Sequence, residues 1–198
     1  MSTSEPIAEV IESSTRQFVA EVHRERPAPA FGTWVCVVRG GQTLFGLVSH
    51  VEHGSYEQSR QPVALGKTRA ELAEEYPQIQ ELLRTTFRAQ VLASAPEDGP
   101  VRQTLPPHPA EIHDFVRACS EAQVQALSAP FDFLRTLVQS PDPAVPVDDL
   151  LVAVLQQVYT AHGGSGSGAD ALVQAGRTLS RLLDDDHERL QSILRRVG

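Results

Sequence analysis

The sequence predicts an α+β protein, in which a small N-terminal β-barrel is followed by a C-terminal α-helical region. Three observations predict this fold class. Apolar and polar residues alternate in short runs over residues 1–95, as they do in half-buried strands. After residue 109, apolar residues recur at spacings of three and four, as they do in helices. A proline-rich stretch without periodicity, residues 96–108, separates the two regions and is interpreted as a linker.

The barrel strands are predicted from their alternation and from the turns between them. Ile7–Glu12 and Gln17–Val22 alternate between apolar and polar residues. The run TWVCVV is apolar on both faces and predicts a central strand, and Gly40-Gly41 after it predicts a tight hairpin, because glycine reaches positive φ at little steric cost. Gly46, inside the run QTLFGLVSHV, indicates a bulge or a sharp bend. A last strand is expected through TTFRAQVLA.

A helix-bearing insertion, at about residues 54–77, interrupts this pattern and contains QPVALGKT, which ends like a phosphate-binding loop. Such a loop needs glycine at its start, where this chain has Gln61, and consecutive N–H groups, which Pro62 cannot supply. The letters GKT are therefore interpreted as a turn and a helix cap. Thr68 followed by Glu71 three residues later predicts a capping box.

The C-terminal region, residues 109–198, is predicted to contain a Gly/Ser-rich tether at residues 163–168. The apolar stripe after this tether either packs on its own domain or enters the groove of a partner, which a flexible tether would favour. Helices are expected at Pro109–Leu127, Phe131–Gln139, Val147–His162 and Ala169–Val197. The candidate partner interface consists of Leu179, Leu183, Leu190, Ile193, Leu194 and Val197.

Composition limits the classes of function. The chain has 25 acidic and 17 basic residues, a formal net charge of −8, which argues against non-specific binding to nucleic acid. It has neither a membrane-length apolar run nor a secretory leader pattern, so we expect a soluble, cytoplasmic protein. The two cysteines, Cys36 and Cys119, are far apart in sequence and lie among apolar neighbours, which predicts reduced core residues.

Motifs that could carry chemistry are weak. His50, Glu52 and His53 could contribute metal ligands, but ordinary polar residues at a strand end explain them more simply. In the acidic run that precedes the last turns of helix, Asp185 followed by Glu188 is interpreted as an N-terminal cap. No nucleophile elbow, catalytic triad or dinucleotide fingerprint is present. We therefore predict no catalytic, cofactor-binding or metal-binding residue, no cofactor, and no enzymatic activity.

The early pattern resembles a known family. The run IAEVIESSTRQFVAEV, a proline loop, FGTWVCVV, a hairpin and LFGLVSHVEH resemble the HAS-barrel, the small barrel named after the HerA DNA translocase and the ATP synthase head. The resemblance covers about residues 6–93, interrupted by the insertion. Barrels of this family usually precede a P-loop ATPase and form a collar that helps to assemble a ring and to receive partners. In this chain a helical region stands in place of the ATPase core.

The resemblance implies the docking part of that role. We expect a non-enzymatic assembly or adaptor protein in a bacterial DNA-processing system, which contacts a HerA-type ATPase or a NurA-type nuclease, or forms homo-oligomers. An alternative comes from the residues themselves: a single-stranded nucleic-acid-binding barrel needs cations beside aromatic side chains. The candidate cations are Arg24, Arg26 and Arg88.

Overall fold

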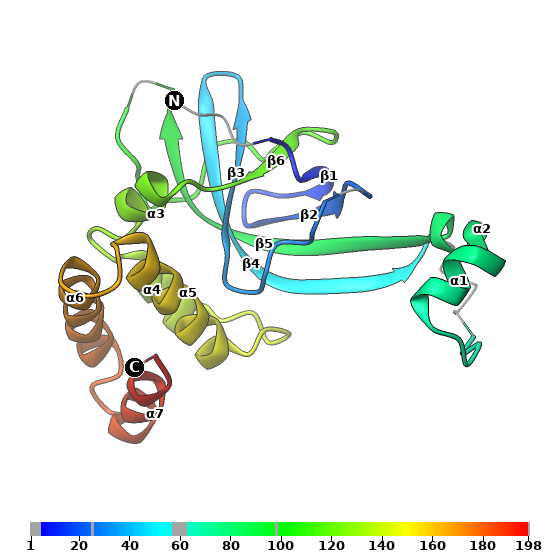
Figure 1. The fold of residues 1–198 in the computed structure, drawn as a ribbon. Coiled ribbons are helices and arrows are strands. Elements are labelled where there is room, and N and C mark those ends of the chain that lie inside the picture. The colour runs from blue at the N-terminus through cyan, green and yellow to red at the C-terminus, as the bar shows by residue number, and fades with distance from the viewer. Residues whose placement is uncertain (1–4, 25, 57–62, 98, 198) are drawn as a thin grey trace.

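The computed structural model describes residues 5–24, 26–56, 63–97 and 99–197. A closed antiparallel β-barrel packs against a group of helices, which confirms an α+β fold with a barrel (Figure 1). The strands follow one another around the barrel in the order β1-β2-β5-β4-β3-β6. They are β1 (Ala8–Ser13), β2 (Gln17–Val22), β3 (Trp34–Arg39), β4 (Gln42–Ser55), β5 (Leu83–Pro96) and β6 (Phe115–Ala118).

The strand that closes the barrel, β6, was not expected. Residues Pro109–Leu127 were predicted as one helix, and the first half of that prediction is wrong: Phe115–Ala118 pairs with both β1 and β3, and helix α3 covers only Glu121–Leu127. A strand of four residues is too short to establish a period of two, whereas the edges of β1 and β3 offer it unpaired backbone groups. The helical region therefore begins after residue 118, not at residue 109.

Glycines shape the barrel where the sequence indicated. Gly40 and Gly41 form the turn between β3 and β4, and both have positive φ. The pairing of β4 with β5 shifts register between Phe45 and Gly46, which confirms the predicted bulge. Gly46 is also required by close packing, because a Cβ atom there would lie 3.0 Å from the Phe18 ring. The barrel interior is filled around this contact.

The residues of β3 divide between two cores. Val35 and Val37 point into the barrel with Phe18. Trp34 and Cys36 point outward into a second and larger core, which the outer faces of β3, β4 and β5 share with the helices. This division explains why the TWVCVV run is apolar on both faces.

The helices that follow β6 in the chain lie on one side of the barrel, and the predicted last helix is divided in two. Asp186 begins the second of these, since its Oδ1 accepts a hydrogen bond from the Arg189 N–H at 3.1 Å; the cap expected at Asp185 is wrong by one residue. The Gly/Ser-rich run forms a turn that Gly168 fixes against Tyr159. The remaining helices are α4 (Phe133–Gln139), α5 (Val147–Ala161), α6 (Ser167–Leu182) and α7 (His187–Val197).

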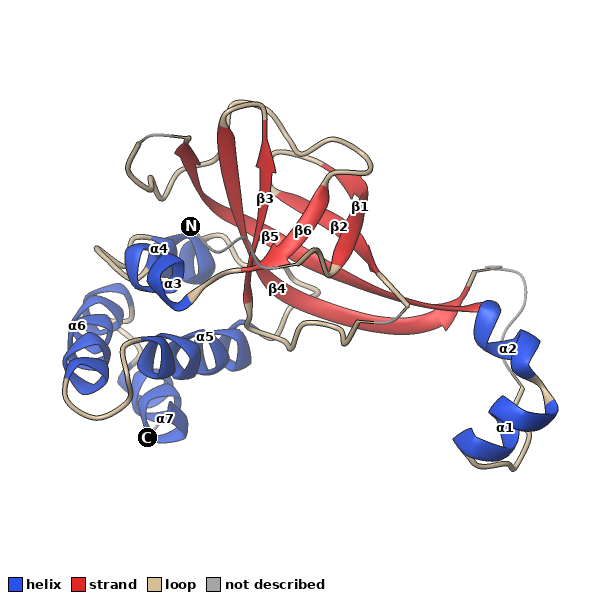
Figure 2. Ribbon diagram, turned by 45° about the horizontal axis from the view of Figure 1, so that its top comes forward, coloured by secondary structure: helices blue, strands red, loops and turns tan. Residues whose placement is uncertain are grey.

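A two-stranded arm projects from the barrel. Strands β4 and β5 remain paired beyond the other strands, as far as Ser55 opposite Leu83. Helices α1 (Arg69–Glu75) and α2 (Pro77–Glu81) lie at the far end of this ribbon, away from the rest of the molecule (Figure 2). We call the paired segments beyond the barrel and everything between them, residues 53–85, the arm. The helical insertion thus extends further along the chain than residue 77.

Replacement of Gly46 by valine is expected to destabilise the barrel. The added side chain would meet Phe18 and Ala89 inside a filled interior, and overpacking of this kind costs about 1–3 kcal/mol in the free energy of unfolding. Urea denaturation followed by circular dichroism would measure the change. Gly54→Val on the same strand is the matched control, because nothing lies within 4 Å of a Cβ there, and it should change stability by less than about 0.5 kcal/mol. Equal losses in the two variants would contradict the packing role of Gly46.

Candidate functional site

The end of the arm exposes apolar side chains that no core covers. Val63 is 79% exposed and Leu65 is 46% exposed. No described side chain between residues 63 and 83 is buried. Exposed apolar groups that gather on one projection are typical of surfaces that bind other proteins. We call the following residues the tip cluster: Val63, Leu65, Tyr76, Leu82 and Leu83.

Polar contacts, not an apolar core, hold the end of the arm together. The predicted capping box is present: the Thr68 N–H donates to Glu71 Oε2 at 2.7 Å, and the Glu71 N–H donates to Thr68 Oγ1 at 3.3 Å. The hydrogen bonds from Thr68 lower the pKa of the Glu71 carboxyl. Lys67, the lysine of the loop-like motif, pairs with Glu75 and lies 5.5 Å from the centre of the Tyr76 ring. Gln61 and Pro62 of that motif lie outside the described residues.

A hollow of about 360 Å³ at the base of the arm gathers arginines from β5 and from the end of β2. Arg24, Arg26 and Arg84 line it, together with Glu21. Arg26 pairs with Glu5, and Arg84 lies 3.8 Å from Glu21. Carboxylates therefore lie beside Arg26 and Arg84 in this hollow.

An aromatic side chain stands beside these cations. Tyr56 is 49% exposed, and the Arg84 guanidinium lies 5.4 Å from the centre of its ring. The Tyr56 hydroxyl donates a hydrogen bond to the Glu21 carboxylate, and this bond raises the pKa of Tyr56. Neighbouring cations and aromatic residues were considered in the sequence, but Tyr56 was missed, because it lies in a polar stretch outside the alternating pattern.

The three predicted nucleic-acid residues do not form one site. Arg24 and Arg26 meet in the hollow, whereas Arg88 is not among its lining residues. Arg88 lies opposite Val19 of β2, and its Nε is buried without a hydrogen-bond partner in the described part of the chain. Five barrel aromatics are buried or partly buried: Phe18, Phe31, Trp34, Phe45 and Phe87. Phe115 of β6 is 46% exposed, and its ring centre lies 6.0 Å from that of His23, which lines the hollow.

The apolar stripe predicted as a partner interface packs mostly within this chain. Leu179, Leu183 and Ile193 are buried in the core shared with the barrel, and Leu190 and Val197 pack against it. Contact between the buried members and a partner would require α6 and α7 to leave α5. Of the predicted interface residues, Leu194, which is 41% exposed, remains at the surface.

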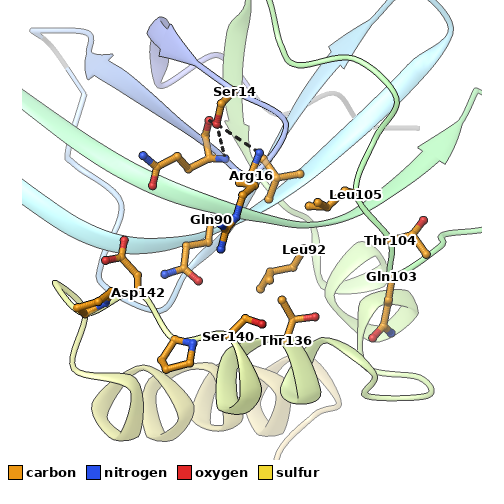
Figure 3. A pocket seen from close by; sticks show the side chains of 14 residues that line it. Ser14, Arg16, Gln90, Leu92, Gln103, Thr104, Leu105, Thr136, Ser140 and Asp142 are labelled. Carbon is orange, nitrogen blue, oxygen red and sulfur yellow. Dashed lines mark hydrogen bonds between the residues drawn. The ribbon is translucent and has the colours of Figure 1, made fainter.

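A groove of about 770 Å³ lies between the barrel and α4 (Figure 3). The sequence analysis did not predict this groove, because four separate segments of the chain form its walls. Arg16 and Asp142 are its only ionisable lining residues. Gln103 on its wall is engaged in the fold, donating to the Leu127 carbonyl and accepting from the Phe133 N–H. The charges of Arg16 and Asp142 offset each other in this otherwise uncharged lining.

The weak metal motif is not assembled into a site. His50 Nε2 lies 3.7 Å from Glu52, while His53 Nδ1 lies 2.7 Å from Thr85 Oγ1. Within the described residues, no group of three or more His, Cys, Asp or Glu side chains could hold a metal ion.

Comparison with protein-family models and with curated proteins finds no match for this chain. None of the helices in the described ranges has both the length and the apolar character that crossing a bilayer requires.

Replacement of Glu21 by glutamine should lower the pKa of Tyr56 towards the ordinary value of a tyrosine. The neutral hydroxyl is favoured in the wild type because it donates to the Glu21 carboxylate, and an uncharged acceptor removes most of that preference. The absorbance change of tyrosinate, measured as the difference between each protein and its Tyr56→Phe counterpart, isolates this group. Because the folded pKa is raised, its stabilising contribution is present below the ordinary tyrosine pKa and is lost as the pH rises through the folded value. An unchanged titration midpoint in Glu21→Gln would contradict the assigned contact.

Proposed function

We propose that this protein is an assembly or adaptor subunit that binds another protein through the end of its arm. The observation that carries the proposal is the tip cluster, which a paired ribbon holds away from both cores. These side chains contribute little to the folding of their own chain. Their burial would instead stabilise a complex, by about 1.5–3 kcal/mol for each fully covered large side chain before the costs of association.

The charge at the end of the arm restricts the partner surfaces that can bind it. Residues 63–83 carry four glutamates against two cations, a net charge of 2 − 4 = −2, and one of the cations, Lys67, pairs with Glu75. An apolar groove with a basic rim would match both properties, because complementary charge speeds encounter and excludes wrong partners.

The resemblance to HAS-barrels supplies the class of partner. Collars of that family are built on small closed barrels, and the closed barrel of this chain supports the same docking role. On this proposal the partner is a HerA-type ATPase, a NurA-type nuclease or another copy of this chain, in bacterial DNA processing. The protein then acts by contact, without turnover.

A photo-crosslinking amino acid at position 63 or 65, expressed in the native cells, is expected to give one dominant protein adduct. The expected adduct is a HerA-type ATPase, a NurA-type nuclease or a second copy of the chain, identified by mass spectrometry. Val38 on the barrel and Val173 on α6 are matched control positions, because both are exposed valines outside the arm. Tip adducts no more abundant than those at the control positions would overturn the proposal.

A shortened arm provides an independent check. Ser55 and Leu83 are register partners, so a two-residue Asn-Gly turn can join them in place of residues 56–82. The variant is expected to keep the circular dichroism and the cooperative unfolding of the body. It is expected to lose binding to the partner, or to a second copy of the chain, as measured by light scattering on a sizing column. Association that survives the shortening would move the contact away from the arm.

A second candidate function is the binding of single-stranded nucleic acid at the base of the arm. The observation that favours it is Tyr56, half exposed beside Arg84 at the edge of the hollow that Arg24 and Arg26 line. An exposed aromatic ring beside arginines is the combination that strand-binding barrels use. Glu5 and Glu21 weaken the local positive potential, and we therefore rank this function second.

The second candidate predicts a salt-dependent mobility shift of labelled single-stranded DNA. Arg24→Gln combined with Tyr56→Ala should abolish the shift at low salt, and each lost phosphate contact should reduce the slope of log K against log salt by about 0.7. Arg177→Gln on α6 removes one charge elsewhere and should leave the shift unchanged. Absence of any shift with the wild-type protein at low salt would exclude this function.

A further inference from the structure

The barrel brings together two cysteines that are far apart in sequence. Strand β3 pairs with β6 so that Cys36 lies opposite Arg117. The Cys119 N–H donates to the Trp34 carbonyl oxygen at 3.0 Å, which places Cys119 opposite Trp34. Cys36 and Cys119 are therefore diagonal neighbours on one face of the sheet. Both cysteines are free, and the interaction between their thiols is the leading cause of the pKa shifts of both groups.

The surroundings give the two thiols different chemical properties. The hydrogen bond from Cys119 lowers the pKa of Cys36, with smaller contributions in the same direction from the Arg117 charge and from Gln123, against an opposing effect of burial. The pKa of Cys119 is raised, first because its thiol donates to Cys36 and then because it is covered. A thiolate is the reactive form of cysteine, so the direction of the two pKa shifts favours Cys36 over Cys119 as the attacking sulfur.

We propose that Cys36 and Cys119 form a dithiol that a peroxide oxidises to an intramolecular disulfide. In the first step, the Cys36 thiolate attacks one peroxide oxygen. The O–O bond breaks, the other oxygen leaves as water after taking up a proton, and Cys36 becomes a sulfenic acid. In the second step, the Cys119 sulfur attacks the Cys36 sulfur, the S–O bond breaks, and hydroxide leaves as water with the Cys119 proton. In total, two thiols and one hydrogen peroxide give one disulfide and two waters.

The bond would join the barrel directly to the helical region. Cys119 immediately precedes Ser120, the N-cap of α3, and Cys36 lies in the middle of β3. Cys119 is partly exposed at this joint, whereas Cys36 is buried. The site is remote from the arm in the fold, so this inference stands independently of the proposed adaptor function (Figure 1).

The test is the oxidation of the reduced full-length protein by hydrogen peroxide, followed by alkylation in denaturant and mass spectrometry. We expect both thiols to be lost together, with an intact mass smaller by two hydrogen atoms. Cleavage after arginine without reduction should then give residues 25–39 linked to residues 118–135. Two alkylated thiols at peroxide doses that oxidise free cysteine, or two separately oxidised sulfurs, would overturn the proposal.

Single variants test the assigned order of the two sulfurs. Cys119→Ser should leave Cys36 as a sulfenic acid that dimedone captures, whereas Cys36→Ser should give little capture at Cys119. Equal capture in both variants would remove the distinction between nucleophile and resolving thiol. Because the disulfide is detected in the wild-type chain, failure of either variant to fold would not affect the main test.

Discussion

The contact between Trp34 and the helices holds the body of this protein together. Trp34 is fully buried, and its ring meets that of Phe133 edge-on, with 5.2 Å between the ring centres. Its backbone N–H donates to Gln157 of α5 at 3.0 Å, and its carbonyl accepts from Cys119. Trp34 thus belongs to a barrel strand, hydrogen-bonds to the segment that closes the barrel, and packs with its side chain in the core shared with the helices. Barrel and helices consequently form two layers around a shared core.

This arrangement leaves the arm as the part of the molecule in which no described side chain between residues 63 and 83 is buried. The body collects apolar side chains in two cores, including most of the stripe that the sequence offered as an interface. Its surface still exposes Val38, Leu105, Ile112, Phe115, Val173 and Leu194. The arm has neither core beneath it, and its helices are shorter than isolated helices need to be to persist in water. Segments with few buried contacts lie at the low end of local stability, where binding elements are commonly found.

Local rules predicted much of the barrel and little of its closure. The hairpin at Gly40, the bulge at Gly46 and the capping box at Thr68 depend on neighbouring residues, so the sequence contains enough information to place them. Strand β6 depends on edges supplied by residues far away, and so does the proximity of Cys36 to Cys119. The apolar stripe on α6 and α7 could pack within the chain or against a partner. Which of these occurs depends on the surface of α5 that faces it, and no local sequence pattern reveals that surface. The groove and the setting of Tyr56 are likewise products of tertiary structure.

Magnitudes favour a protein partner over a nucleic acid. In the hollow, Glu5 lies beside Arg26 and Glu21 beside Arg84, and a phosphate would have to compete with these carboxylates on a chain of net charge −8. Exposed ion pairs are worth about 0–1 kcal/mol each, so exchanging one for another gains little. Covering Val63 and Leu65, which are 79% and 46% exposed, removes apolar surface from water. Each side chain then contributes its exposed share of the about 1.5–3 kcal/mol that burial of a fully exposed side chain provides. The larger uncompensated free energy lies at the end of the arm, and an apolar protein surface is the kind of partner that can recover it.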